Sequence, residues 1–191
     1  MDFKLSILIP TLKSRTNQLL NVVSILNKQI KDCQAFGMVE ILIDEDNREL
    51  TTGAKRNRLI ENAKGKYTVF MDDDDEPSNN YISLILNAIE SNPDVIPING
   101  YMSTNGHGQK FWDMGLGFGY GIKYLNGLQV FDRFPNHIAP MKKELIKDFK
   151  FLNVTIGEDY EWAKRINDSG VLKTESRITE PVYHYKFNEN K

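Results

Sequence analysis

The chain lacks several features that define whole classes of protein. Cys33 is the only cysteine among 191 residues, so no internal disulfide can form. No Cys/His spacing matches a zinc site, and no apolar run approaches the roughly 18 residues of a membrane-spanning helix. Met1–Lys4 lead into no signal-peptide hydrophobic region. These absences predict a cytoplasmic protein without a transmembrane segment.

Charge of one sign is not in excess either. The chain has 24 Lys and Arg against 26 Asp and Glu, which gives a net charge of −2. There is therefore no global electrostatic case for binding nucleic acid or an anionic membrane, although a local basic groove stays open. With 40% hydrophobic residues, the composition is that of one ordinary domain with a substantial core.

Negative charge is instead concentrated at one point. Three apolar residues, Val69–Met71, run directly into five acids, Asp72–Glu76, and Pro77 follows. Because adjacent carboxylates repel one another, such a cluster is costly without a cation. A buried strand that ends in these acids would place them at the ligand-binding edge of an α/β sheet, where Mg²⁺ or Mn²⁺ could be shared with substrate phosphates. The alternative is an acid-rich helix start.

The preceding segments predict a βαβ unit. Residues 5–9 form an apolar run that Pro10 closes, and residues 16–34 have helical apolar spacing. A second strand over 39–43 then ends in the acids Asp44 and Asp46. Parallel pairing of the two strands would bring these acids to the same sheet edge, where a carboxylate can accept from a base N–H or a ribose hydroxyl. A solvated turn is an equal alternative.

The segment Gly53–Ala63 predicts a helix with basic residues in its first turns. Cations near a helix N-terminus are disfavoured by the dipole, so an anion is expected nearby. That anion would be a diphosphate or the acid cluster, and a solvated basic face is the alternative.

Residues 100–128 combine glycines with aromatic side chains. A strand over 94–99 precedes them. Glycine beside aromatic residues favours a mobile loop that covers and stacks on a substrate, and a strand pair with glycines relieving aromatic crowding is the alternative.

A last helix is expected over about residues 158–168, ended by Gly170. Glu158 and Asp159 would lie in its first turn, where the dipole keeps a carboxylate ionised, as a catalytic base requires. A purely structural acid explains the pattern equally well. His184 near the end of the chain is more often an ordinary histidine than a ligand.

Taken together, these segments resemble family 2 glycosyltransferases of the GT-A fold. The resemblance rests on the order and spacing of five segments within about residues 4–185: Ser6–Thr11, Glu40–Asp44, Gly53–Asn57, Phe70–Asp75 and Gly157–Asp159. It implies an α/β fold with a Rossmann-like, mostly parallel central sheet flanked by helices. It also implies one domain over 1–191, with a nucleotide-sugar half over about 1–98 and an acceptor-binding, catalytic half over about 99–191.

The resemblance implies a metal-dependent, inverting transfer from a nucleotide-diphosphate sugar, with UDP favoured. Asp159 would be the catalytic base, and Asp74 of the Asp-x-Asp motif would bind Mn²⁺ or Mg²⁺ with His184 as a further ligand. Four consecutive aspartates leave a share of the metal open to Asp73 or Asp75. Asp44 would hold the base, and Asp72 would face the ribose. The donor nucleotide would contact Pro10, Thr11, Asp44, Arg56, Asn57, Asp72 and Asp73.

The acceptor is expected to be a saccharide or surface glycan, with Trp112 and Tyr120 in the stacking loop. A hydroxymethylated base in phage DNA is a less favoured acceptor because of the net charge of −2. The candidate basic strip for it is Lys142, Lys143, Lys147 and Lys150. A nucleotidyltransferase is a second interpretation. Such enzymes usually carry a glycine-rich signature loop after the first strand, whereas residues 10–13 contain no glycine. A non-catalytic binding module is a third, and a retained Glu158–Asp159 pair counts against it.

Overall fold

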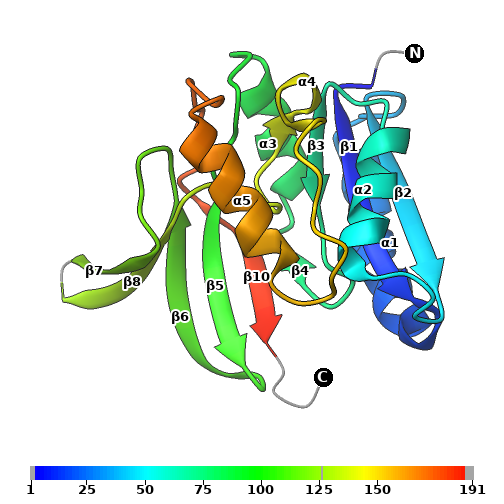
Figure 1. Cartoon of the computed structure of the whole chain (residues 1–191), viewed down its shortest axis with the longest axis horizontal. Helices are drawn as coiled ribbons and strands as arrows, with labels where there is room; N and C mark the ends of the chain where they lie inside the picture. The colour runs from blue at the N-terminus through cyan, green and yellow to red at the C-terminus, as the bar shows by residue number, and fades with distance from the viewer. Residues whose placement is uncertain (1–2, 126, 188–191) are drawn as a thin grey trace.

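The computed structural model describes residues 3–125 and 127–187, and it shows two β-sheets flanked by helices (Figure 1). Met1 and Asp2, where no signal peptide was expected, lie outside the described residues. In chain order the elements are β1 (Leu5–Leu12), a 3-10 turn η1 (Lys13–Arg15), α1 (Thr16–Asp32), β2 (Val39–Asp46), α2 (Thr52–Asn62), β3 (Tyr67–Phe70), β4 (Glu76–Pro77), α3 (Tyr81–Ile89), β5 (Asn99–Thr104), β6 (His107–Met114), β7 (Gly121–Leu125), β8 (Leu128–Arg133), β9 (Met141–Lys142), α4 (Lys143–Ile146), α5 (Glu158–Ser169) and β10 (Pro181–Phe187).

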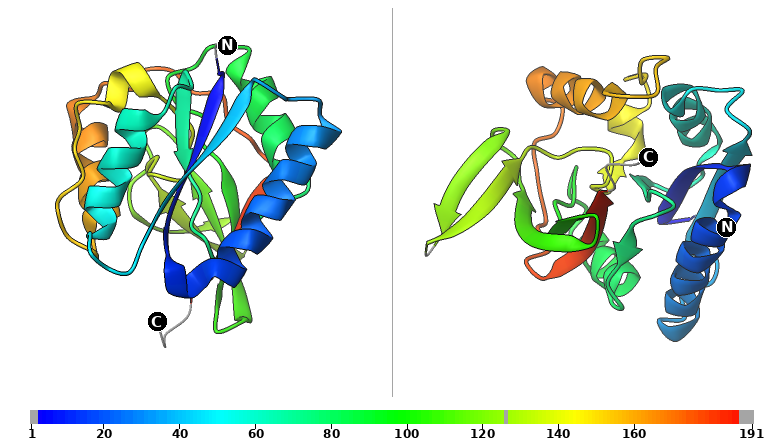
Figure 2. Two further views of the ribbon diagram at one scale, coloured as in Figure 1. Left: turned by 90° about the vertical axis from the view of Figure 1, so that its right-hand side faces the viewer. Right: turned by 90° about the horizontal axis from the view of Figure 1, so that it is seen from below.

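The first sheet contains the predicted parallel unit. Its order is β2-β1-β3-β9, and β1 runs parallel to both β2 and β3. Helices α1 and α3 cover one face and α2 covers the other (Figure 2). The α/β fold class, with helices on both faces of a mostly parallel sheet, is thus confirmed, because an apolar strand buried on both faces needs a helix layer on each side.

The prediction that Pro10 ends the first strand is wrong. Strand β1 continues to Leu12, and Pro10 lies opposite Asp44 of β2. The carbonyl of Leu8 accepts from the N–H of Met71, so Pro10, two residues further on, turns its nitrogen to the same side. Strand β3 has already ended there, at Phe70, so the missing N–H of proline costs no ladder bond.

A second sheet of six strands was not predicted. Its order is β4-β10-β5-β6-β8-β7, and the β7–β8 hairpin projects from the body of the molecule (Figure 1). The expected mobile loop over 100–128 is wrong for most of its length, since strands β5 to β8 occupy it and the strand-pair alternative holds. The expected strand over 94–99 is also wrong, because β5 begins only at Asn99.

The long helices agree with the predicted ones at their main positions. Helix α5 ends at Gly170, whose φ of 61° is the left-handed conformation expected of such a glycine. Helix α1 begins at Thr16. The Thr16 hydroxyl donates to the Lys13 carbonyl at 2.8 Å, and the N-cap residue is Arg15, which makes no side-chain cap bond.

One hydrophobic core connects the two sheets. It extends from Leu5 in β1 to Tyr183 in β10 and includes the fully buried Trp112. The division into two halves near residue 98 stays a prediction. Within residues 3–125 and 127–187, no helix has the length and apolarity that crossing a bilayer requires.

Candidate active site

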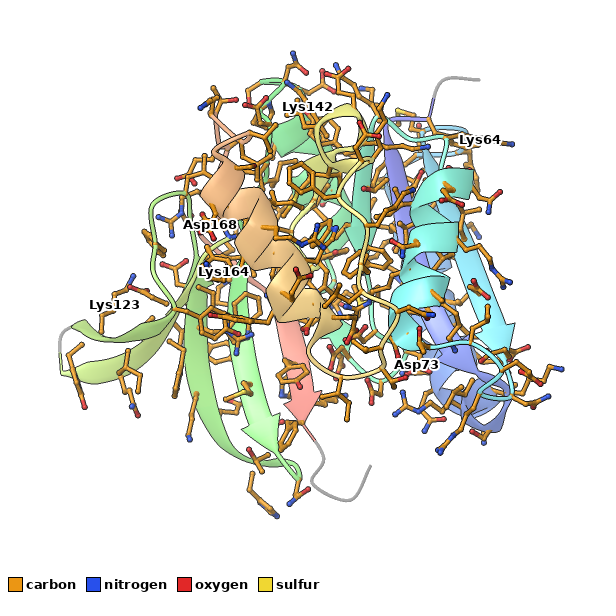
Figure 3. All side chains as sticks on the ribbon, in the orientation of Figure 1. Lys64, Asp73, Lys123, Lys142, Lys164 and Asp168 are labelled. Carbon is orange, nitrogen blue, oxygen red and sulfur yellow. The ribbon has the colours of Figure 1, made fainter. Side chains whose placement is uncertain are left out.

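A cleft of about 760 Å³ opens at the carboxyl ends of β1 and β3. Figure 3 shows Asp73 at this end of the first sheet, with Lys64 and Lys142 at the opposite end. The cleft is lined by Pro10, Thr11, Leu12 and Arg15, by residues 48–52, by Lys55 and Arg56, by Asp72–Asp74, by residues 155–159 and by Tyr185. The predicted acid cluster, basic helix start and C-terminal acidic pair therefore share one cavity.

The four consecutive aspartates have different surroundings. Asp73 is buried and accepts from the Thr11 hydroxyl at 2.6 Å and from the Arg15 guanidinium at 2.7 Å. Asp72 faces Arg56 at 3.3 Å, and Asp74 faces Arg15 at 3.7 Å. Asp72 therefore faces Arg56, whereas the adjacent Asp73 and Asp74 both face Arg15.

Asp75 points away from this cleft. It accepts from the Tyr183 hydroxyl at 2.7 Å and from the backbone N–H of Lys186 at 2.8 Å, which connects the acid cluster to β10. Burial and the neighbouring Asp72 raise the pKa of Asp75 to about 7. Asp75 does not line the cleft, so it is not placed to share a metal ion bound there.

Arg56 connects the two acidic groups of the cleft. Its buried guanidinium lies 3.3 Å from Asp72 and 3.2 Å from Glu158, and its face covers the rings of Phe70 and Phe151. Lys55 is bound to Asp46 at 2.7 Å. The basic start of α2 is thus balanced by carboxylates, one of the two anions that the sequence predicted.

Asp159 and Glu158 lie in the first turn of α5, as predicted. Gly157 precedes them with a φ of 82°, a backbone conformation that glycine adopts without strain. Burial raises the pKa of Asp159, but His137, Arg56 and the backbone N–H of Tyr160 outweigh it and bring the pKa below its usual value. Burial raises the pKa of Glu158, and Arg56 offsets only part of that. Of the two, Asp159 is therefore the carboxylate suited to accept a proton.

The structure does not bring every predicted residue to the cleft. Asp44 is buried in an ion pair with Arg58. The side-chain amide of Asn57 accepts from the backbone N–H of Phe151 at 2.8 Å and donates to the Phe151 carbonyl at 2.9 Å. Neither lines the cleft, because Asp44 lies within β2 and Asn57 faces the segment before α5. We leave both out of the donor site. The prediction of Trp112 as an acceptor-loop residue is wrong, since its side chain is fully buried beside Tyr183.

Tyr120 and His184 have different outcomes. The Tyr120 ring is 53% exposed and lies 5.1 Å from the ring of Tyr160, next to Asp159. His184 forms a hydrogen bond of 2.9 Å with Ser103 and lines a smaller cleft of about 330 Å³ that also has Asp74 on its wall. Asp74 therefore lies between the two clefts.

Some site residues carried no signal in the sequence. Arg15 is the last residue of the 3-10 turn η1, which directly follows β1. Tyr185 lies in β10, a strand that was not predicted. His137 is buried between Asp72 and Asp159, at 3.8 and 3.7 Å. Only contacts between distant segments identify these three, although the isolated position of His137 among just three histidines could have drawn attention.

The carboxylates fit one kind of metal site better than another. Among the described residues, no group of three or more His, Cys, Asp or Glu is arranged to hold a metal ion. The part of the chain that the structure describes therefore forms no all-protein cage for a metal ion. The hard oxygens of Asp72–Asp74 along the cleft fit a Mg²⁺ or Mn²⁺ ion that takes its other ligands from substrate phosphates and water.

The model of a known family, glycosyl transferase family 2, matches residues 6–151. The chain belongs to this family. Its members are enzymes that transfer sugars, and the matched range includes the acid cluster and the basic start of α2 but ends before Asp159. Among curated proteins, none matches the chain significantly.

Solved glycosyltransferases share the fold. The S. aureus TarS fragment 1–349, solved with UDP-GlcNAc, matches 99% of this chain at a TM-score of 0.67 and 17% identity. The catalytic domain of Drosophila β1,4-galactosyltransferase 7, solved with xylobiose, matches 94% of this chain at a TM-score of 0.59 and 19% identity. This chain spans 60% of the TarS fragment and 67% of the galactosyltransferase chain.

Proposed function

We propose that this family 2 member is an inverting, metal-dependent glycosyltransferase that moves a sugar from UDP to a hydroxyl of a saccharide. One observation carries the proposal. A carboxylate held ionised at the start of α5, Asp159, shares a cleft with the acid cluster and a buried arginine. A protein that only binds a nucleotide sugar has no use for such a base. We further propose a cytoplasmic location, which suits the free thiol of Cys33.

The donor would occupy the cleft between β1 and the acid cluster. Pro10 and Thr11 form one wall, and Asp72 and Asp73 would face the ribose. Arg56 lines the same cleft and would supply a cation for the diphosphate. The TarS fragment has been solved with UDP and with UDP-GlcNAc, which supports UDP as the nucleotide proposed here.

Asp74 would hold the metal, with His184 reaching it from the adjoining cleft. A bound Mn²⁺ or Mg²⁺ would supply positive charge against the diphosphate. Arg56 contributes the same kind of stabilisation from the protein, because its guanidinium is fixed before the reaction by two carboxylates and two aromatic rings.

The transfer itself needs one base and one leaving group. The acceptor hydroxyl oxygen forms a bond to the anomeric carbon while Asp159 takes the hydroxyl proton. The bond from the anomeric carbon to the β-phosphate oxygen breaks on the opposite face, and its electron pair leaves with UDP. A single displacement of this kind inverts the anomeric configuration.

The acceptor would bind on the α5 side of the cleft. Tyr120, Phe134 and Tyr160 form an aromatic cluster with ring centroids 5.1 to 5.9 Å apart, and Tyr120 and Tyr160 are partly exposed. Exposed aromatic faces beside a base suit the C–H faces of a saccharide. The galactosyltransferase complex with xylobiose is a saccharide complex of the same fold. A DNA acceptor gains no support, since Lys142, Lys143 and Lys150 are engaged by Asp94, the Ala63 carbonyl and Glu61.

Calorimetric titration of UDP, GDP and CDP, with and without Mn²⁺, tests the donor site. We expect Mn²⁺ to tighten UDP binding, and Asp74→Ala to abolish that gain. Asp168→Ala is the matched control, because Asp168 is an exposed aspartate on α5 that pairs with Lys164 on the same helix (Figure 3). Absence of metal-dependent binding by all three nucleotides would contradict the proposal.

Asp159→Asn then separates a transferase from a binding protein. We expect UDP release from UDP-GlcNAc, UDP-glucose or UDP-galactose, with an oligosaccharide mixture as acceptor, to fall roughly 10²- to 10⁴-fold. The affinity for UDP should stay within a factor of about two, because Asp159 is proposed to contact the acceptor and not the nucleotide. Equal turnover by the wild type and Asp159→Asn would show that Asp159 is not the catalytic base.

A further inference from the structure

His137 lies at the centre of the site, yet the reaction as described gives it no role. It belongs to the segment between β8 and β9, and its side chain is 7% exposed. Its backbone carbonyl accepts from the N–H of Phe70 at 2.9 Å, so the residue is fixed against the end of β3. The imidazole therefore has little freedom to move away from the acids around it.

Each ring nitrogen of His137 faces a different carboxylate. Nε2 lies 3.8 Å from an oxygen of Asp72, and Nδ1 lies 3.7 Å from an oxygen of Asp159. Both nitrogens are buried and neither has a hydrogen-bond partner. Buried polar atoms without partners are uncommon in native proteins, and they call for an explanation. Here each ring nitrogen lies a few tenths of an ångström beyond hydrogen-bond distance of a carboxylate that lines the cleft.

We propose that His137 is a positioning residue for the catalytic base. This proposal rests on the proposed function of Asp159 as that base. When donor and acceptor fill the cleft, Nδ1 and Nε2 come within hydrogen-bond distance of Asp159 and Asp72, so one ring fixes the base relative to the donor-side carboxylate. Asp72 and Asp159 come from opposite halves of the chain, and His137 is the described side chain that faces both at once.

The charges around the ring decide what its removal does to Asp159. Arg56 of α2 contributes positive charge, and Asp72 after β3 together with Glu158 of α5 contribute negative charge. Without His137, the favourable interaction with the Asp159 carboxylate is lost while burial and Asp72 still oppose its ionisation. The pKa of Asp159 must then rise, and the base is protonated over more of the working pH range.

A structural histidine predicts something else. The His137 ring lies 6.2 Å from that of Phe70 in a tilted arrangement, so packing alone could retain it. In that case a replacement would change the melting temperature but leave the titration of Asp159 where it is. The two roles therefore differ in a quantity that can be measured directly.

Carboxyl NMR on ¹³C-aspartate-labelled protein tests the proposal without any substrate. The Asp159 signal is the one that Asp159→Asn removes. We expect His137→Gln and His137→Asn to shift its titration midpoint to higher pH, and His107→Gln to leave it unchanged, because His107 is exposed on β6 outside both clefts. A midpoint in the folded His137 variants equal to that of the wild type would overturn the proposal.

A second measurement uses the wild type and so does not depend on the folding of a variant. In a crystal structure with UDP, Mn²⁺ and a saccharide acceptor, the Nδ1 to Asp159 distance should shorten from 3.7 Å to about 3 Å. An unchanged or longer distance with a filled cleft counts against the proposal.

Kinetics separates this proposal from the proposed function. We expect His137→Gln to lower kcat roughly 10- to 100-fold, to move the acidic limb of the kcat profile upward, and to leave the KM for the UDP-sugar within about twofold. If the wild type transfers no sugar, the proposed function fails, but the carboxyl titration still tests whether His137 acts on Asp159. If the wild type is active and His137→Gln matches His107→Gln, only the role of His137 fails.

Discussion

At the residue scale, Arg56 shows how one side chain serves the fold and the site together. Its guanidinium is buried between Asp72 and Glu158, so the folded protein carries a charged network inside the cleft wall. Removing one partner of such a network leaves the other charges uncompensated, which costs about 3–5 kcal/mol. A test of its role in binding must therefore keep the positive charge.

Arg56→Lys keeps the charge and removes the fork of donors. We expect the affinity for UDP with Mn²⁺ to fall about tenfold, because a lysine ammonium cannot contact two acceptors in a fixed plane. Isothermal titration calorimetry measures this change. The matched control is Arg58→Lys, since Arg58 is held by Asp44 outside the cleft. Equal losses in both variants would show that Arg56 has no special place in the donor site.

At the element scale, the start of α2 holds the segment that leads into α5. The N–H of Gly53 donates to the carbonyl of Val154 at 3.0 Å, and the Thr51 hydroxyl donates to the side-chain oxygen of Asn153 at 2.6 Å. Three residues after Val154 the chain reaches Gly157 and then the acidic pair. The position of the base therefore depends on how closely these two elements approach.

Gly53→Ala should disturb that approach. A Cβ at residue 53 would meet the Leu152 carbonyl oxygen at 1.8 Å, and a backbone oxygen cannot yield as the end of a flexible side chain can. We expect a loss of about 2 kcal/mol in the free energy of unfolding, measured by urea denaturation, with a fall in turnover. Gly119→Ala is the control, because a Cβ added there would have no atom within 4 Å and the backbone is compatible with alanine. A neutral Gly53→Ala would contradict the tight contact.

At the scale of the whole molecule, the two sheets supply different sides of the cleft. The parallel sheet delivers Thr11 and the acid cluster, whereas the aromatic side chains near α5 come from segments that flank the second sheet, with Tyr120 just before β7 and Phe134 just after β8. Exposed Tyr120 lies against Tyr160, while exposed Tyr124 lies further along the projecting hairpin. The donor and acceptor sides of the proposed reaction therefore depend on separate layers of the fold.

Tyr120→Ala should separate these two sides. We expect the KM for the saccharide acceptor to rise several-fold, with a loss of about 1 kcal/mol of stacking energy, while UDP affinity stays constant. Steady-state kinetics at saturating UDP-sugar measures it. Tyr124→Ala is the control and should change neither constant, because Tyr124 lies within β7, four residues beyond Tyr120, and is 73% exposed. A change in UDP affinity for Tyr120→Ala would place this ring on the donor side instead.

Local patterns in the sequence were enough to predict the first half of the fold and the kinds of group in the site. Apolar runs predicted β1, β2 and β3, and acids follow the runs of β2 and β3, whereas Pro10 interrupts that of β1. Strands β1 and β3 are buried along nearly their whole length, and such burial shows directly in the residues of a strand. The acid cluster and Asp159 were found because charge at a strand end or in a helix first turn has a local physical cause.

Tertiary structure decided which of these groups meet. Asp44 and Asn57 are of residue types that can bind a nucleotide, but Asp44 pairs with Arg58 and Asn57 with the backbone of Phe151, outside the cleft. Trp112 was expected in a loop because glycines surround it, and only the pairing of β5 with β6 and its contact with Tyr183 bury it. The place of His137 depends on Asp72 and Asp159, which lie 65 residues before it and 22 after it. No local pattern encodes such contacts, because they exist only once distant segments have packed against each other.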